Sequence, residues 1–189
     1  NPATLAALMT PPAPAGGGGP PPGGAPPAPP AAASERLANG VYRITGGYVA
    51  LAVEFNDHIL IFEPAGQNEA RSQAIIAEAK RVIPNKPIRY GVLSHHHFDH
   101  TSGIGAVVAE GITIVTHETN KAFFEKALSG PRTLAPDAMA KAGKKAVIET
   151  VGDKRVFTDG TQTVEIHNNK GLPHADGMLI AYIPSARIV

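Results

Sequence analysis

One short run near the middle of the chain concentrates side chains that can bind a metal; it reads Ser94-His95-His96-His97-Phe98-Asp99-His100. The apolar stretch directly before it, residues 88–93, is typical of a buried strand. Successive side chains alternate sides in an extended backbone. We therefore expect His95 and His97 to point the same way and His96 to point away from them.

Asp99 and His100 complete this set of ligands, because they follow where the chain turns and can converge beside His95 and His97. Imidazole nitrogens with a carboxylate oxygen suit zinc and are tolerated by iron and manganese. The alternative is a solvated loop with a chance histidine cluster, or a tag-like run. Tags are not interrupted by Phe and Asp and do not follow a buried strand, so the run predicts a metal site.

The pattern His-x-His-x-Asp-His, after a hydrophobic strand and before a Gly-containing helix start, resembles the signature of the metallo-β-lactamase superfamily. The turn Gly171-Leu172-Pro173-His174-Ala175-Asp176-Gly177 is similar to the second histidine motif of that family. The resemblance extends over most of residues 40–189. It implies an α/β fold, an αββα sandwich of mixed sheets with helices on the outer faces, whose C-terminal part we expect this chain to lack.

His174 completes the first metal position in this interpretation. Its Gly- and Pro-containing turn directly precedes a strongly apolar strand, which would aim the ring inward. With His95 and His97 it makes a three-histidine set that leaves a fourth position for water. Coordination to zinc lowers the pKa of water from 15.7 to about 7, which supplies a hydroxide nucleophile at neutral pH.

The resemblance also assigns Asp99 and His100 to a second metal position. The family completes that position with a bridging Asp after the strand that follows His174, and with a later histidine. Neither has a counterpart before Val189, so we expect the chain to stop short of them. From the residues alone, Asp99 has another candidate role, as the catalytic general base that orients the water at the first metal.

Three further polar residues lie near these motifs in the predicted elements. Glu63 ends a strand where many relatives carry the Asp of an Asp-Thr-Gly-like turn, but ordinary turn chemistry before Pro64 is the favoured role. His117 ends a buried strand, and lining the pocket or satisfying the start of the next helix are both open. His58 is expected to face solvent on an edge strand.

The elements that must position these side chains alternate between strands and helices. Strands are expected at 41–44, 48–53, 58–62, 88–93, 112–115, 147–151, 155–157, 163–167 and 178–183. Helices are expected at 69–83, capped by Asn68, and at 120–128. A short helix is also expected to start from caps within 101–103 and to run through 108. The strand–helix–strand step across 58–93 is typical of a sheet covered by helices.

The first 34 residues differ from the rest, because they hold no Asp, Glu, Lys or Arg and 11 of the 18 prolines. Such a stretch cannot bury enough apolar surface to fold. We expect residues 1–34 to be a disordered linker rich in Pro, Gly and Ala, with room for a preceding domain, and residues 35–189 to form the metallo-β-lactamase-like domain.

The composition excludes several other classes of protein. A net charge of +1 with scattered Lys and Arg gives no footprint for nucleic acid. No run of about 18 apolar residues predicts a membrane span. The absence of Cys excludes disulfides and thiolate zinc sites without deciding the compartment. Because the chain begins at Asn1, a lost signal peptide slightly favours a periplasmic or secreted location over a cytoplasmic one.

Together these features predict a zinc-dependent hydrolase in which metal-bound hydroxide attacks a carbonyl of a small-molecule substrate. One or two zinc ions are expected, with iron or manganese as alternatives. The superfamily cleaves β-lactams, lactones, thioesters and phosphodiesters, and the metal motif does not choose among them. Two other functions stay open: a mononuclear iron oxygenase of the same fold, and a module that binds metal or ligand without turnover.

Overall fold

The computed structural model describes residues 31–189. The predicted linker therefore lies outside the described residues, apart from its last four. Of these, Ala33 and Ser34 already belong to the first strand and pair with Thr45 and Ile44. The first strand thus begins two residues before the expected start of the domain.

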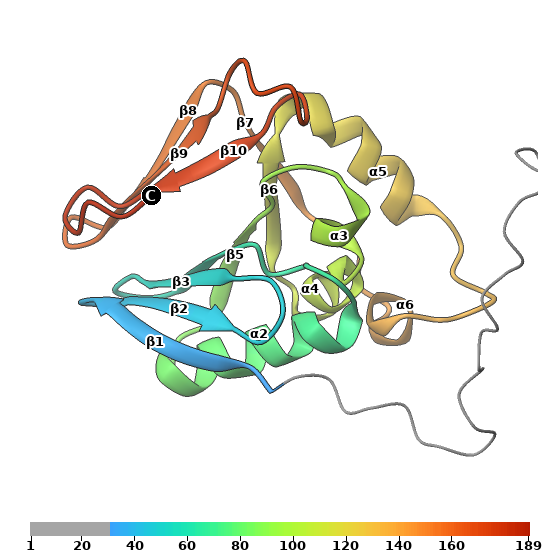
Figure 1. The fold of residues 1–189 in the computed structure, drawn as a ribbon. Helices are drawn as coiled ribbons and strands as arrows, with labels where there is room; N and C mark the ends of the chain where they lie inside the picture. The colour runs from blue at the N-terminus through green and yellow to red at the C-terminus, as the bar shows by residue number, and fades with distance from the viewer. Residues whose placement is uncertain (1–30) are drawn as a thin grey trace, which may run out of the picture.

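Two sheets and a group of helices make up the fold (Figure 1). The first sheet has seven strands in chain order: β1 (Ala33–Ala38), β2 (Val41–Thr45), β3 (Ala50–Glu54), β4 (Ile59–Phe62), β5 (Ile88–Val92), β6 (Thr113–His117) and β7 (Ile148–Val151). The second sheet has three strands in the order β10-β9-β8: β8 (Lys154–Thr158), β9 (Thr163–Asn168) and β10 (Leu179–Tyr182). The helices are α2 (Glu69–Val82), α3 (Phe98–Thr101), α4 (Ile104–Glu110), α5 (Lys121–Ser129), α6 (Ala138–Ala142) and the 3-10 turn η1 (Glu118–Asn120). Within residues 31–189, every helix is too short or too polar to cross a lipid bilayer.

Two hydrophobic cores lie on the two faces of the seven-stranded sheet. Strand β4 shows how the sequence builds both, since Ile59 and Ile61 pack toward the helices and Leu60 packs toward the second sheet. All three side chains are fully buried. The predicted α/β sandwich of two sheets with helices outside is therefore confirmed as the fold class.

Helix α2 forms as predicted and joins two parallel neighbours, β4 and β5. Its N-cap is Asn68, whose side-chain oxygen accepts a hydrogen bond from the Arg71 N–H at 2.9 Å. The buried face includes Ile75 and Ile76 and packs on the sheet. This crossover places the end of β5, and the histidine run after it, at the same sheet edge as the end of β4.

The short helix expected from caps within 101–103 through 108 forms as α4, with Gly103 at its N-cap position. The chain also forms α3 directly before it, with a break at Gly103. The break allows a close approach to α2. A side-chain carbon added at Gly103 would lie 1.9 Å from the Ser72 hydroxyl oxygen and 2.5 Å from the Asn68 carbonyl oxygen. On the other side of this break, helix α3 starts at Phe98, inside the histidine run.

The expectation that His58 faces solvent is wrong. His58 is 7% exposed, its ring stacks on Phe55, and Tyr90 packs edge-on against it. Its Nδ1 lies 2.6 Å from an Asp57 carboxylate oxygen. The reason is tertiary, because Phe157 of the second sheet packs on Tyr90 and covers this end of the first sheet.

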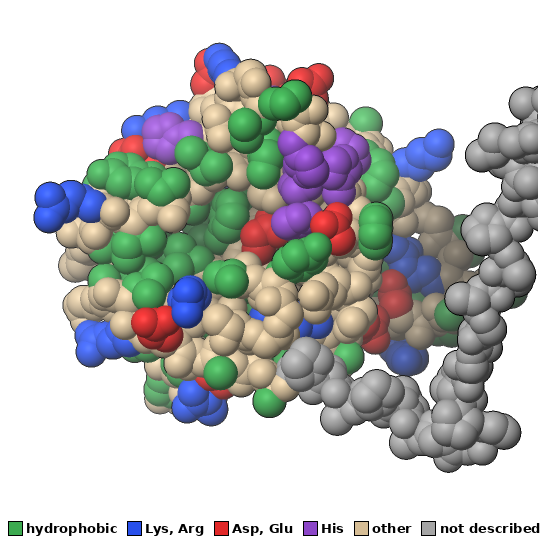
Figure 2. Space-filling model, viewed as in Figure 1, with side chains coloured by type: hydrophobic (Ala, Val, Ile, Leu, Met, Phe, Trp, Pro, Cys, Tyr) green, Lys and Arg blue, Asp and Glu red, His purple; other side chains and the backbone are tan. Residues whose placement is uncertain are grey.

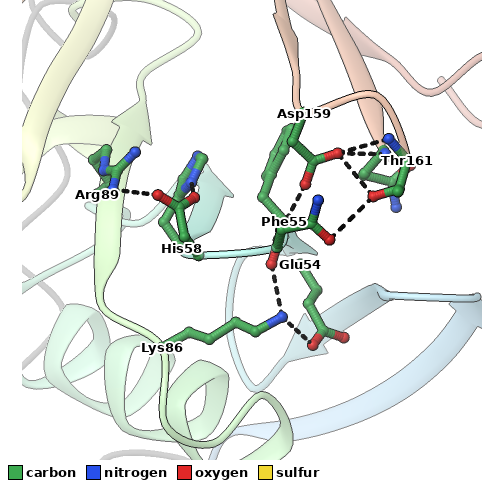
Figure 3. Close-up of polar contacts among 10 residues, drawn as sticks. Glu54, Phe55, His58, Lys86, Arg89, Asp159 and Thr161 are labelled. Carbon is green, nitrogen blue, oxygen red and sulfur yellow. Dashed lines mark hydrogen bonds and ion pairs between the residues drawn. The ribbon is translucent and has the colours of Figure 1, made fainter.

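Hydrogen bonds of Asp159, within its own turn and to the turn at 56, tie the two sheets together (Figure 3). We call this group of bonds the polar clamp. The Asp159 carboxylate accepts hydrogen bonds from the backbone N–H groups of Asn56 at 2.6 Å, Gln162 at 2.8 Å and Thr161 at 2.9 Å. These donors, led by Gln162, hold the pKa of Asp159 well below its ordinary range. The clamp joins the β8–β9 turn to the β3–β4 turn.

We predict that Asp159→Ala lowers the free energy of unfolding at pH 7 by about 1 kcal/mol, because it removes the charged acceptor of three backbone N–H groups, of which that of Gln162 is partly buried. Since the folded-state pKa is lowered, this contribution is complete above the ordinary Asp pKa, shrinks as the pH falls below it, and is gone once the pH passes the lowered folded-state value. Urea unfolding at pH 7 and pH 3 measures it. The control is Asp153→Ala, which breaks only an exposed pair with Lys170 and should have almost no effect. Equal losses in both variants would contradict the clamp.

Candidate metal centre

Three histidine rings converge at the ends of two segments that are far apart in sequence. His95 Nε2 lies 3.1 Å from His174 Nε2, and His97 Nδ1 lies 3.2 Å from that same atom. The facing nitrogens of the three rings all lie within 4.8 Å of one another. Nitrogens on a tetrahedral zinc ion with bonds of about 2.0–2.1 Å are roughly 3.3 Å apart. The spacing therefore fits one first-row metal ion.

Local structure explains the orientation of His95. It follows β5 with its neighbour Ser94, whose hydroxyl lies 2.8 Å from His95 Nδ1, so that Nε2 is the nitrogen left to face the other rings. The ring is 1% exposed. Burial, followed by the nearby imidazole of His100, lowers the pKa of His95 to about 4. The ring is therefore neutral at pH 7, the state in which imidazole binds a metal.

Asp99 and His100 lie beside this trio, as the sequence predicted. Asp99 Oδ2 is 3.6 Å from His100 Nε2, and the ring centroid of His100 is 4.3 Å from that of His95. Figure 2 shows histidine side chains gathered on one face of the molecule with acidic side chains next to them. The structure thus brings all five predicted ligands together, while their binding of one or two ions stays a prediction.

Tyr48 contacts both Asp99 and His100, a pair of contacts that no sequence pattern predicted. Its hydroxyl donates to Asp99 Oδ2 at 2.9 Å, and its ring stacks on His100 with centroids 5.2 Å apart. The hydrogen bond lowers the pKa of Asp99 and raises the pKa of Tyr48. Asp99 is therefore held ionised, as a ligand or a general base must be.

Glu63 lies in the bend that ends β4, where the sequence predicts a turn, and its carboxylate also supports the same region. One carboxylate oxygen accepts a hydrogen bond from the Ser94 N–H at 2.6 Å, and the other contacts His100 Nδ1. Glu63 is 8% exposed and has a φ of 62°, a strained value for a residue with a side chain. Its carboxylate raises the pKa of His100.

His96 and His117 both lie outside the trio. His96 points away, as expected, and its Nδ1 lies 2.8 Å from the Asn120 side-chain oxygen. His117 is the N-cap of η1, where its ring nitrogen accepts from the Thr119 N–H at 3.2 Å. Of the two roles left open for His117, the structure therefore shows the one at the start of a helix.

Comparison with known proteins identifies the family. The sequence model of the metallo-beta-lactamase superfamily matches residues 44–188. The chain therefore belongs to the metallo-beta-lactamase superfamily. No curated protein sequence matches the chain closely enough to count as a relative.

Solved metallo-beta-lactamases share the fold. A metallo-beta-lactamase from Pontibacter korlensis has a TM-score of 0.59 at 20% identity, covering 82% of this chain and 67% of its own. FIM-1 from Pseudomonas aeruginosa, solved in the mono-zinc form, has a TM-score of 0.57 at 18% identity, with 84% and 67% covered. MEM-A1, a subclass B3 enzyme from a soil metagenome library, has a TM-score of 0.59 at 18% identity, with 82% and 58% covered. This chain thus spans about two thirds or less of the length of these structures.

We predict that Glu63→Gln makes the metal-free protein less stable at pH 6, by on the order of 1 kcal/mol, while keeping an acceptor for the Ser94 N–H. Because Glu63 raises the folded-state pKa of His100, the stabilisation is complete below the ordinary histidine pKa and is lost as the pH rises through the raised value. The difference between the two proteins should therefore shrink toward pH 9, measured by urea unfolding with a chelator present.

The matched control is Glu165→Gln, which removes the carboxylate beside His167, a half-exposed pair in the second sheet. Water screens that pair, so the control should show much less dependence on pH. If the free energy of unfolding of Glu63→Gln changes with pH in parallel with that of the wild type from pH 6 to pH 9, Glu63 does not raise the pKa of His100.

Proposed function

We propose that the protein is a zinc-dependent hydrolase that acts on a small molecule with a reactive carbonyl. The observation that carries the proposal is the convergence of ring nitrogens from His95, His97 and His174 at distances of 3.1 and 3.2 Å. Membership of the metallo-beta-lactamase superfamily supports it.

His95, His97 and His174 would hold the ion as neutral ligands. A zinc ion in such a site polarises a carbonyl oxygen and lowers the pKa of a coordinated water. Asp99 would orient the attacking water and accept its proton. Tyr48 donates to Asp99 Oδ2 and so orients the carboxylate for that work.

His100 enters the proposal through a second ion, which Asp99 and His100 would share. Their facing atoms, Asp99 Oδ2 and His100 Nε2, are 3.6 Å apart, close to the ligand spacing that a single ion needs. With two side chains instead of three, this position should bind more weakly than the histidine trio. FIM-1, which shares the fold, was solved in a mono-zinc form. We therefore propose that the first ion to bind occupies the position formed by His95, His97 and His174, and that the weaker position fills only afterwards.

A three-histidine set also suits iron, so metal analysis of protein purified without added zinc separates the hydrolase from an iron oxygenase. A panel of a β-lactam, a lactone and a thioester then separates a hydrolase from a module that only binds. Zinc bound at one equivalent, with no turnover of any of the three, would favour the binding module.

We predict that the zinc-loaded chain hydrolyses at least one of the three substrates, that a chelator abolishes the activity, and that added zinc restores it. His174→Ala should lower kcat/KM by more than about 100-fold, since loss of a ligand should exceed the 10- to 100-fold cost of losing an outer partner. The matched control, His167→Ala, removes a half-exposed histidine in β9 that bonds to Glu165 and should leave kcat/KM within about twofold. Equal activity of the two variants would contradict the assigned role of His174.

A further inference from the structure

The turn that carries His174 packs against residues 117–120, which connect β6 to α5 and are called the corner here. On its far side, the Leu179 N–H donates to the Ser94 carbonyl at 2.8 Å, which ties the start of β10 to the start of the histidine run. Between these points, Gly177 rests directly against the corner. The position of the His174 ring therefore depends on how this turn is seated.

Asn120 lies at the centre of this corner. It occupies the N-cap position of α5, where an Asn side chain commonly accepts from the next turn of the helix, but here it makes no such bond. The side chain instead spans two other segments. Its oxygen lies 2.8 Å from His96 Nδ1, and its nitrogen donates to the Gly177 carbonyl at 3.3 Å. Asn120 is 3% exposed, so these bonds replace the water that the buried amide has lost.

The direction of this chain of hydrogen bonds follows from the Gly177 carbonyl, which can only accept. The NH2 group of Asn120 must therefore face Gly177, and its oxygen must face His96. His96 Nδ1 then carries a proton and donates it. His96 points away from the histidine trio, yet it links the histidine run to the His174 turn through Asn120.

Gly177 shows that the His174 turn packs closely against this corner. Its φ is +65°, a conformation that favours glycine. A side-chain carbon added there would lie 2.3 Å from both His117 Nδ1 and the Thr119 hydroxyl oxygen. Even one extra carbon would therefore lift the turn away from the corner.

We propose that Asn120 is a positioning residue of the metal centre, which sets the His174 ring relative to His95 and His97 by bridging His96 to Gly177. This inference rests on the metal site of the proposed function. It assigns to the buried amide a role in metal affinity in addition to its role in packing.

The first test is the affinity of the full chain for Zn²⁺ alone, measured by competition with a chromophoric chelator. Asn120→Ala should weaken binding of the first ion by about 10-fold, the lower end of the 10- to 100-fold cost of losing a group bonded directly to a ligand, because Asn120 acts on His174 through the backbone of its turn. The matched control is Asn168→Ala, which removes an amide 3.0 Å from His117 Nε2 at the same corner but outside the bridge. Its zinc affinity should stay within about threefold of the wild type.

A double-mutant cycle distinguishes positioning from general stability. If Asn120 acts through His174, Asn120→Ala should change zinc affinity no further once His174→Ala is present, while its effect on unfolding persists. Gly177→Ala provides an independent variant that disturbs the same seat, and it should also weaken zinc binding in the presence of His174 but not in its absence.

The outcomes separate the two claims. Wild-type protein that binds no zinc would overturn both the proposed function and the role of Asn120. Wild-type protein that binds zinc, with equal affinity in Asn120→Ala and Gly177→Ala, would overturn the positioning role alone. Equal losses of affinity for Asn120→Ala with and without His174 would also overturn it, since the effect would then not pass through that ring.

Discussion

The arrangement depends on one constraint: three imidazole nitrogens must face one another across the junction of two sheets. His95 and His97 follow a strand of the first sheet, and His174 lies on a turn of the second. Burial keeps His95 neutral, so this ring can offer a lone pair to a metal. Such a cluster is unfavourable unless a cation or a proton sits between the rings. The packing of the sheets therefore has to hold the rings in place before any ion binds.

Polar contacts around the rings serve this constraint. Glu63 joins the end of β4 to Ser94 and His100, and Tyr48 fixes Asp99 from the β2–β3 loop. Each contact comes from an element other than the one that carries the ligand. The candidate ligands are thus held from outside, which is the condition for a preorganised site.

Much of this could be predicted from the sequence, and the failures have a common cause. The alternation that turns His95 and His97 one way and His96 the other is local, as is the cap of α2 at Asn68. The burial of His58 under the second sheet and the contacts of Glu63 are tertiary, so residue type and neighbours did not reveal them. Tyr48 reaches Asp99 across 51 positions, with only a Gly-Gly pair before it to mark a loop. Sequence patterns thus indicated which side chains lie together as candidate ligands, but not the residues that support them.

The central claim is that His95, His97 and His174 bind one ion together. The most direct measurement is to add one equivalent of Zn²⁺ to metal-free, ¹⁵N-labelled protein and follow the imidazole nitrogens by NMR. We predict that Nε2 of His95, Nδ1 of His97 and Nε2 of His174 shift together, while the rings of His58 and His167 do not change. Zinc that leaves the His174 ring unchanged, or that shifts none of the three, would contradict the account.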